Sequence, residues 1–467
     1  MHAHARGHML GILATTVTFG LLLLLPRAAP AIPAFSRIYG KACNACHVAF
    51  PKLSLAGEEF RHSGYHRYAG GTEVPKVKPI RIHNQVYLPG IVPLSLLIEA
   101  GWDIRHIKED KTSGEEEVIK ANSFNPEEVE LLAGGTLGRH VSYFLDFPMV
   151  EGEFEEDEGG FIIEGPEIPE LAFIALNDIL ANDVLNLKFG IIELPLAFSP
   201  SHRRLSVAEY EIYAVNARDL LGIGSGAVGL ENGAKRLRLK KGQIGVEFYG
   251  NFYPELTGIP DLIVRYHIGV INGTSINTDN NQEKTIYGRL EFTYLNQSIG
   301  FFGLYDPNTV DETPPAGFPG TKNRAWRLGP DISLRFLRET LNLFSQFLYG
   351  RDTSPTGRGV DLKYWGGFAE VDYKLPLGRA GDLMSLLRFD YVFTERFDDT
   401  TVGGSVRTKP RIFAVTFGLQ YYFWQNFKFV VEYTYREEKE KLSVAESTRD
   451  NHRVRENIGT IRATLVF

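Results

Sequence analysis

The chain has 467 residues, of which 43% are hydrophobic and 12% are aromatic, and it contains 47 glycines. This length exceeds what most single domains need but is common for one all-β barrel, and the glycine content suits many turns. The formal net charge of −7 and the lack of any basic block argue against a nucleic-acid partner.

Residues 1–31 are predicted to be an export signal. An apolar run from Met9 to Leu25 follows Arg6, Pro26 ends the run, and Ala29-Pro30-Ala31 is a small-x-small cleavage site. The alternative is an uncleaved anchor, for which the run is short. No other stretch approaches the roughly 18 consecutive apolar residues of a spanning helix. Any membrane residence of the mature chain therefore has to come from a β-barrel.

The only two cysteines form the pattern Cys43-Asn44-Ala45-Cys46-His47. This spacing is typical of covalent c-type haem attachment, in which two thiols bond the vinyl groups and the histidine is an axial iron ligand. A structural disulfide or a thioredoxin-like dithiol is the alternative, but no βαβ pattern surrounds the motif. We expect one covalent haem c held by Cys43, Cys46 and His47.

The region from residue 32 to residue 82 is predicted to be a short monohaem cytochrome segment. It has helical character from Pro51 to Tyr65, and turn signals follow at Gly70-Gly71 and Pro75. About fifty residues bury too little apolar area to enclose a haem. We therefore expect this segment to lie in the mouth or lumen of the rest of the chain, which would complete the haem pocket.

Residues 83–467 are predicted to be an outer-membrane β-barrel with about 16 antiparallel strands. Strict alternation gives each strand one apolar face and one polar face, as in Arg411 to Phe423. A soluble sandwich would alternate too, but aromatic strand ends and alternating short and long connections favour a transmembrane barrel. An even strand count places both termini on the periplasmic side. Strands are expected at 94–107, 125–138, 141–150, 168–178, 183–195, 236–252, 260–272, 284–295, 298–306, 324–337, 341–350, 361–375, 384–396, 410–423, 427–437 and 455–467. Long loops are expected at 108–124, 152–167, 196–235, 307–323, 397–409 and 438–454.

The residues around the haem motif resemble a known family. The matching pieces are Pro33-Ala34-Phe35-Ser36-Arg37, Phe50-Pro51-Lys52-Leu53, Gly57-Glu58-Glu59-Phe60 and Gly64-Tyr65. This pattern is similar to that of the fused outer-membrane cytochrome–porins of iron-oxidising bacteria. The close match covers roughly thirty residues, and the barrel matches in architecture only.

The resemblance implies an electron conduit that oxidises extracellular Fe(II) and passes electrons to a periplasmic c-type cytochrome or another carrier. Its activity would be that of an Fe(II):cytochrome c oxidoreductase. Two alternatives stay open: a haem-bearing porin with a different donor or acceptor, and a diffusion porin with a structural haem. The acidic residues at 109–117 and 153–158 could gather Fe(II), although solvated charge runs are common. The stretch from Leu205 to Leu221 has helical character inside a long loop and is a candidate for a pore-narrowing segment.

The sixth iron ligand has three histidine candidates. His62 and His66 follow the motif closely, and His267 lies on the lumen parity of its strand. Met149 has the parity of a lipid-facing residue and Met384 lies beside a turn, so a methionine ligand is not expected. A ligand other than methionine, or an open sixth position, would give a lower potential than His/Met ligation, which suits Fe(II) oxidation near neutral pH.

Overall fold

The computed structural model describes most of the chain beyond the predicted export signal. The described residues are 34–68, 71–72, 76–78, 80–83, 86–110, 116–138, 140–155, 160–164, 168–198, 203–221, 237–273, 282–309, 322–355, 359–399, 406–439 and 453–467. The export signal and Pro33 lie outside them. Within these residues, no helix is both long and apolar enough to cross a membrane.

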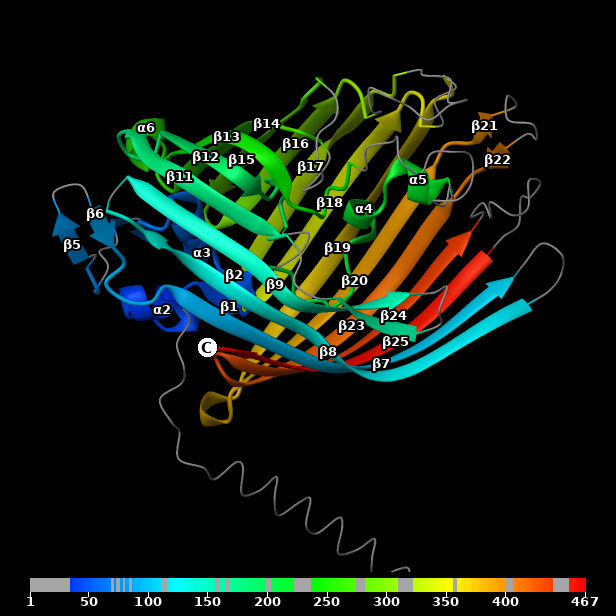
Figure 1. Cartoon of the computed structure of the whole chain (residues 1–467), viewed down its shortest axis with the longest axis horizontal. Helices are drawn as coiled ribbons and strands as arrows, with labels where there is room; N and C mark the ends of the chain where they lie inside the picture. Colours follow the sequence, from blue (N-terminus) through cyan, green and yellow to red (C-terminus); the bar gives the residue numbers. More distant parts are fainter. Residues whose placement is uncertain are drawn as a thin grey trace, which may run out of the picture. The chain divides into compact units, whose positions relative to one another are not determined.

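Sixteen antiparallel strands of the described chain close into a barrel (Figure 1). Each strand pairs with the next along the chain, and the last pairs with the first. A further strand, β10 (Gly160–Glu164), continues the ladder of β9 beyond β11. The sixteen are β7 (Leu94–Asp110), β8 (Glu116–Thr136), β9 (Val141–Glu155), β11 (Leu171–Leu180), β12 (Leu185–Ile192), β13 (Gln243–Phe252), β14 (Leu262–Ile271), β15 (Thr285–Tyr294), β16 (Gln297–Asp306), β17 (Ala325–Phe336), β18 (Leu341–Asp352), β19 (Leu362–Pro376), β20 (Asp382–Thr394), β23 (Arg411–Trp424), β24 (Phe427–Lys439) and β25 (Arg453–Val466).

The outer face of the barrel is apolar and the inner face is polar, as the alternation predicts. On β23, Phe413 and Phe417 are 44% and 48% exposed, whereas Thr416 and Gln420 are completely buried. Large apolar side chains are exposed in the same way on most strands. Soluble proteins do not expose so large an apolar surface to water. A closed barrel also leaves no strand edge with unpaired backbone N–H and C=O groups in hydrocarbon. The barrel therefore spans a membrane, and the soluble-sandwich alternative is wrong.

The two ends of the barrel differ in their connections. At the turn end, short connections join β8 to β9, β15 to β16, β17 to β18 and β23 to β24. The first residues of β7 and the last residues of β25 also lie at this end. At the opposite, loop end, the connections are mostly longer. The predicted loop at 108–124 is wrong, because β7 and β8 continue as a paired hairpin up to Asp110 and Glu116. Their charged side chains suggested a loop, but ion pairs such as Lys108–Glu116 (2.5 Å) occur along the strands.

Short elements precede the barrel. They are α2 (Ala34–Tyr39), the 3-10 helix η1 (Cys43–Ala45), β1 (His47–Ala49), β2 (Lys52–Leu53), α3 (Leu55–His62), β3 (Arg67–Tyr68), β4 (Gly71–Thr72), β5 (Ile80–His83) and β6 (Val86–Leu88). The helix expected from Pro51 to Tyr65 is shorter, because Ser54 caps α3 by accepting a hydrogen bond from the Gly57 N–H. Residues 34–68 are called the N-terminal segment below.

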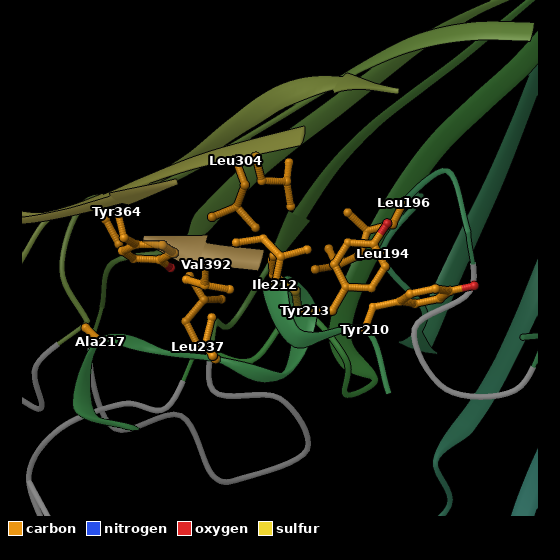
Figure 2. Close-up of a cluster of buried hydrophobic side chains, with 14 of the residues drawn as sticks. Leu194, Leu196, Tyr210, Ile212, Tyr213, Ala217, Leu237, Leu304, Tyr364 and Val392 are labelled. Carbon is orange, nitrogen blue, oxygen red and sulfur yellow. The ribbon is translucent and has the colours of Figure 1, made fainter. Parts of the chain in front are cut away.

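The described part of the connection from β12 to β13 folds into the lumen and fills part of it. It contains α4 (Glu211–Ala214) and α5 (Ala217–Leu220), and α4 packs on β19 and β20. Figure 2 shows apolar side chains of this connection, among them Tyr210, Ile212 and Tyr213, gathered with wall residues such as Tyr364 and Val392. We call residues 193–198, 203–221 and 237–242 the plug loop. The prediction of a pore-narrowing segment in Leu205–Leu221 is thereby confirmed.

Arg388 of β20 anchors the plug loop to the wall. Its guanidinium donates hydrogen bonds to the carbonyl oxygens of Ala208 (2.9 Å) and Glu209 (2.7 Å) and pairs with Asp390 (2.6 Å). Glu432 of β24 accepts from two backbone N–H groups of the same stretch, Val207 (2.8 Å) and Ala208 (2.7 Å). The loop is therefore held by charge-assisted hydrogen bonds as well as by apolar packing.

Replacing Arg388 by Met should loosen the plug loop. The change removes the donors and leaves Asp390 buried without its partner, which costs roughly 3–5 kcal/mol. We expect the single-channel conductance in planar bilayers to rise above that of the unchanged protein. Replacement of Arg379, exposed in the β19–β20 turn, should leave the conductance unchanged. Equal conductance in all three proteins would show that Arg388 does not hold the loop.

Candidate functional site

The N-terminal segment lies in the lumen at the turn end and contacts the wall on several sides. Side chains of the barrel meet it through ion pairs and hydrogen bonds. Lys52 pairs with Asp372 of β19, and His66 Nε2 lies 2.6 Å from Asp183 Oδ1 in the β11–β12 turn. The backbone N–H of Leu55 donates to Glu339 in the β17–β18 turn (3.0 Å). This confirms the expectation that the segment lies in the barrel mouth.

Barrel side chains also bind backbone carbonyls of the segment. Lys374 Nζ donates to the Val48 carbonyl oxygen (2.7 Å), and the Tyr422 hydroxyl lies 2.7 Å from the Phe50 carbonyl oxygen. On the other side, Asn251 Nδ2 donates to the carbonyl oxygen of His62 (3.2 Å). The backbone on both sides of the predicted haem motif is thus fixed by the wall, and not by the segment alone.

Apolar contacts divide between the segment and the wall in the same way. Ile38, Tyr39, Phe60 and Tyr65 form a small cluster with Phe35, and Phe144 of β9 packs against it. Val48 and Ala49 pack with Met384, Leu386 and Tyr422 of the wall and with Leu205 of the plug loop. Met384 is therefore buried in the lumen beside the residues that follow His47, whereas Met149 faces outward as predicted.

The backbone of the motif is held close to α3. Cys46 donates its N–H to the Cys43 carbonyl oxygen (3.1 Å), and the Cys46 carbonyl oxygen accepts from the Ser54 N–H (2.9 Å). A Cβ atom at Gly57 would lie 2.0 Å from that carbonyl oxygen, so only glycine permits the approach. This explains physically why a glycine stands three residues after the helix cap.

A cavity of about 560 Å³ lies between the N-terminal segment, the plug loop and one side of the wall. Cys43, Cys46 and His47 line it from the segment. The wall part comes mainly from β24, β25 and β7–β9, and the plug loop contributes Arg203 to Val207. Its volume falls in the range of roughly 300–1,000 Å³ that small-molecule and cofactor pockets occupy.

The imidazole of His47 is neutral. Burial lowers the pKa of its imidazole to about 4, so the ring is uncharged at neutral pH. Its Nδ1 lies 3.0 Å from the Pro51 carbonyl oxygen, which can only accept, so Nδ1 carries the proton. The lone pair is then on Nε2, the atom that binds a metal. Hydrogen bonding of the other ring nitrogen to a carbonyl is the usual way in which a protein orients a histidine ligand.

The two cysteines are free thiols at the cavity. No disulfide joins Cys43 and Cys46. Both line the cavity, and burial raises the pKa of the Cys43 thiol. Two thiols, a neutral imidazole and a cavity of this volume together fit a c-type haem. If a haem is bound, Cys43 and Cys46 would hold its vinyl carbons, and His47 would bind its iron.

The three candidate sixth ligands lie elsewhere. None of His62, His66 and His267 lines the cavity. The ring of His62 lies 5.2 Å from that of His267, and burial lowers the pKa of His62 well below its usual value. His267 faces the lumen as predicted, with Nδ1 3.3 Å from Glu247, and His66 is engaged by Asp183. Their role as iron ligands stays a prediction.

The predicted collection of Fe(II) at acidic residues also stays a prediction. Within the described residues, no group of three or more His, Cys, Asp or Glu side chains is arranged to hold a metal ion. Asp110 pairs with Arg455 (2.6 Å) and Glu116 with Lys108. The stretch at 156–159 and the side chains of 153–155 lie outside the described part.

Comparisons with known proteins return structures but no sequence relatives. No family model and no curated protein match the chain. Similar solved structures include an anion-selective porin from Comamonas acidovorans (10% identity, 79% of this chain and 99% of that one, TM-score 0.47). OmpT, an outer membrane protein of Vibrio cholerae, has 9% identity over 80% and 97% of the two chains (TM-score 0.44). The outer membrane channel DcaP of Acinetobacter baumannii has 11% identity over the same shares (TM-score 0.44).

Replacing Tyr422 by Phe should loosen the motif without disturbing the barrel. The change removes the hydroxyl beside the Phe50 carbonyl. Loss of this hydrogen bond should lower the free energy of local opening by about 1 kcal/mol, which raises the opening equilibrium constant about fivefold. We expect faster amide hydrogen exchange in residues 47–53, measured by mass spectrometry. The matched control is Tyr266→Phe, because the Tyr266 hydroxyl donates to the Val184 carbonyl oxygen in a turn of the wall (2.7 Å). Unchanged exchange in Tyr422→Phe would contradict the anchoring role.

Proposed function

We propose that this chain is an outer-membrane electron conduit that holds one covalent haem c in the lumen cavity, oxidises extracellular Fe(II) and passes electrons to a periplasmic carrier. The observation that carries the proposal is that Cys43, Cys46 and the neutral His47 line one cavity of about 560 Å³. A bound haem would supply one-electron chemistry that no side chain of the site provides.

The chain's own residues supply what such a cofactor needs. The segment alone has too small a core to shield a haem, and the wall of β24, β25 and β7–β9 adds the missing surface. Tyr422 and Lys374 hold the backbone around His47, so the direction of the ligand is set by the barrel. Burial of the site lowers the local dielectric, which is one means by which a protein tunes a haem potential.

The plug loop narrows the lumen, which favours a conduit over an open diffusion porin. A diffusion porin needs a water-filled path, whereas the plug loop packs Tyr210, Ile212 and Tyr213 on the inner wall. A haem held in the lumen would place a one-electron carrier inside a protein that spans the apolar layer of ~25 Å. The turn end, where the segment lies, would then face the periplasm.

Loss of the thiols should remove the haem. In the Cys43→Ala/Cys46→Ala protein, the haem-dependent peroxidase stain that survives denaturing electrophoresis should disappear, because no thioether remains. The matched control is Ser36→Ala. Ser36 lines the same cavity, and this protein should keep the stain. A stained band in the double replacement would refute covalent attachment at these residues.

Fe(II) should reduce the haem of the purified full-length protein. Stopped-flow mixing of the oxidised protein with Fe(II) near pH 7 should produce the reduced haem bands. A haem that dithionite reduces but Fe(II) does not would overturn Fe(II) as the donor and support a haem porin with a different one. A protein without haem would overturn the whole proposal.

A further inference from the structure

Lys428 is a buried lysine on the wall of the candidate haem cavity. It is the second residue of β24, faces the lumen and is only 7% exposed. It lines the same cavity as Cys43, Cys46 and His47. Its Nζ lies 5.7 Å from the centre of the Phe50 ring, and that ring lies 5.5 Å from the ring of His47. Lys428 and the predicted iron ligand thus lie beside the same Phe50 ring.

Two of the carboxylates near Lys428, those of Glu99 and Glu432, are engaged by other groups. Glu99 on β7 binds Arg462 Nη1 through one oxygen (2.7 Å) and Thr464 through the other. Both oxygens of Glu432 accept hydrogen bonds from backbone N–H groups of the plug loop. In the part of the chain that the structure describes, Lys428 forms no ion pair.

Other lysines that line this cavity do have acidic partners. Lys188 Nζ lies 2.8 Å from Glu247, and Lys240 Nζ lies 2.6 Å from Glu209. A buried ammonium group with no counter-charge costs several kcal/mol. Near Lys428, Glu99 and Glu432 are bound by other groups, and Lys428 itself lines the cavity. The missing negative charge is therefore expected to come from whatever the cavity holds.

We propose that Lys428 is the counter-charge for a propionate carboxylate of the bound haem. This inference rests on the proposed function, because a haem brings two propionates with it. Lys428 would be a positioning residue that fixes the haem edge against β24. Its positive charge would also favour the reduced haem, which carries one positive charge less than the oxidised haem, so it would raise the potential.

The test is the midpoint potential of full-length, haem-loaded protein in detergent, measured by spectroelectrochemistry. Lys428→Met should lower the potential and leave the absorption spectrum of the haem unchanged. Lys428→Arg, which keeps the charge, should restore most of the potential. Lys240→Met is the matched control, because Lys240 lines the cavity but has Glu209 as its partner, and it should shift the potential less.

Each outcome separates the inference from the proposed function. A wild-type protein without covalent haem overturns the proposed function, and the inference with it. A loaded Lys428→Met protein with an unchanged potential overturns the inference alone. A changed iron-ligand band in Lys428→Met also overturns it, because the lysine would then be an iron ligand and not a propionate partner. A fall in potential that Lys428→Arg does not reverse points to lost packing and likewise overturns it.

Discussion

The pairing of β7 with β25 is the constraint on which the rest of the structure depends. These strands hydrogen-bond from Arg453↔Asp110 to Val466↔Leu97, and Phe467 completes the ladder with Leu96. Without this seam, two strand edges would lie unpaired in hydrocarbon, which costs several kcal/mol for each polar group. The seam also creates a lumen whose polar wall needs partners. Every other feature of the site lies inside that lumen.

The seam positions the N-terminal segment as well. The segment precedes β7 in the chain, and it is attached to the first residues of that strand. The Ala34 N–H donates to Ser95 Oγ (2.7 Å), and the Arg37 guanidinium binds the Leu94 carbonyl oxygen. A segment too small to fold around a cofactor is thereby placed against the barrel wall, which forms through the pairing of its own strands. The cavity belongs to both parts, and neither part would form it alone.

Much of the fold was predictable because a strand in a membrane barrel has a strict period of two. Lumen residues such as Thr416 and lipid-facing residues such as Phe417 could be assigned from parity alone. The placement of the segment followed from its small size. The hairpin at 108–124 was missed because charged residues resemble a loop when the cross-strand partners, such as Lys108 and Glu116, are unknown.

The candidate site was predictable only where its residues lie close together in the sequence. The motif residues Cys43, Cys46 and His47 lie within five positions, so their spacing carries the chemistry. Two of the histidines proposed as sixth ligands, His62 and His66, were chosen by nearness along the chain and His267 by its lumen parity, and the structure places all three outside the cavity lining. Lys428 gave no signal, because its parity marks it as an ordinary polar lumen residue. What distinguishes it is that neighbouring Glu99 is bound to Arg462 and Thr464, a fact of three-dimensional contact.

The cavity has walls from opposite ends of the chain, and this sets an order of assembly. Its motif lies at residues 43–47, whereas the strand that seals the barrel, β25, begins at Arg453. The cavity cannot be complete until the last strand has been exported and has found the first. A bulky group that must be bonded to Cys43 and Cys46 is most accessible to a ligation enzyme before that moment. If a haem is bonded to these cysteines, biogenesis of the protein would therefore favour cofactor attachment before insertion and closure of the barrel.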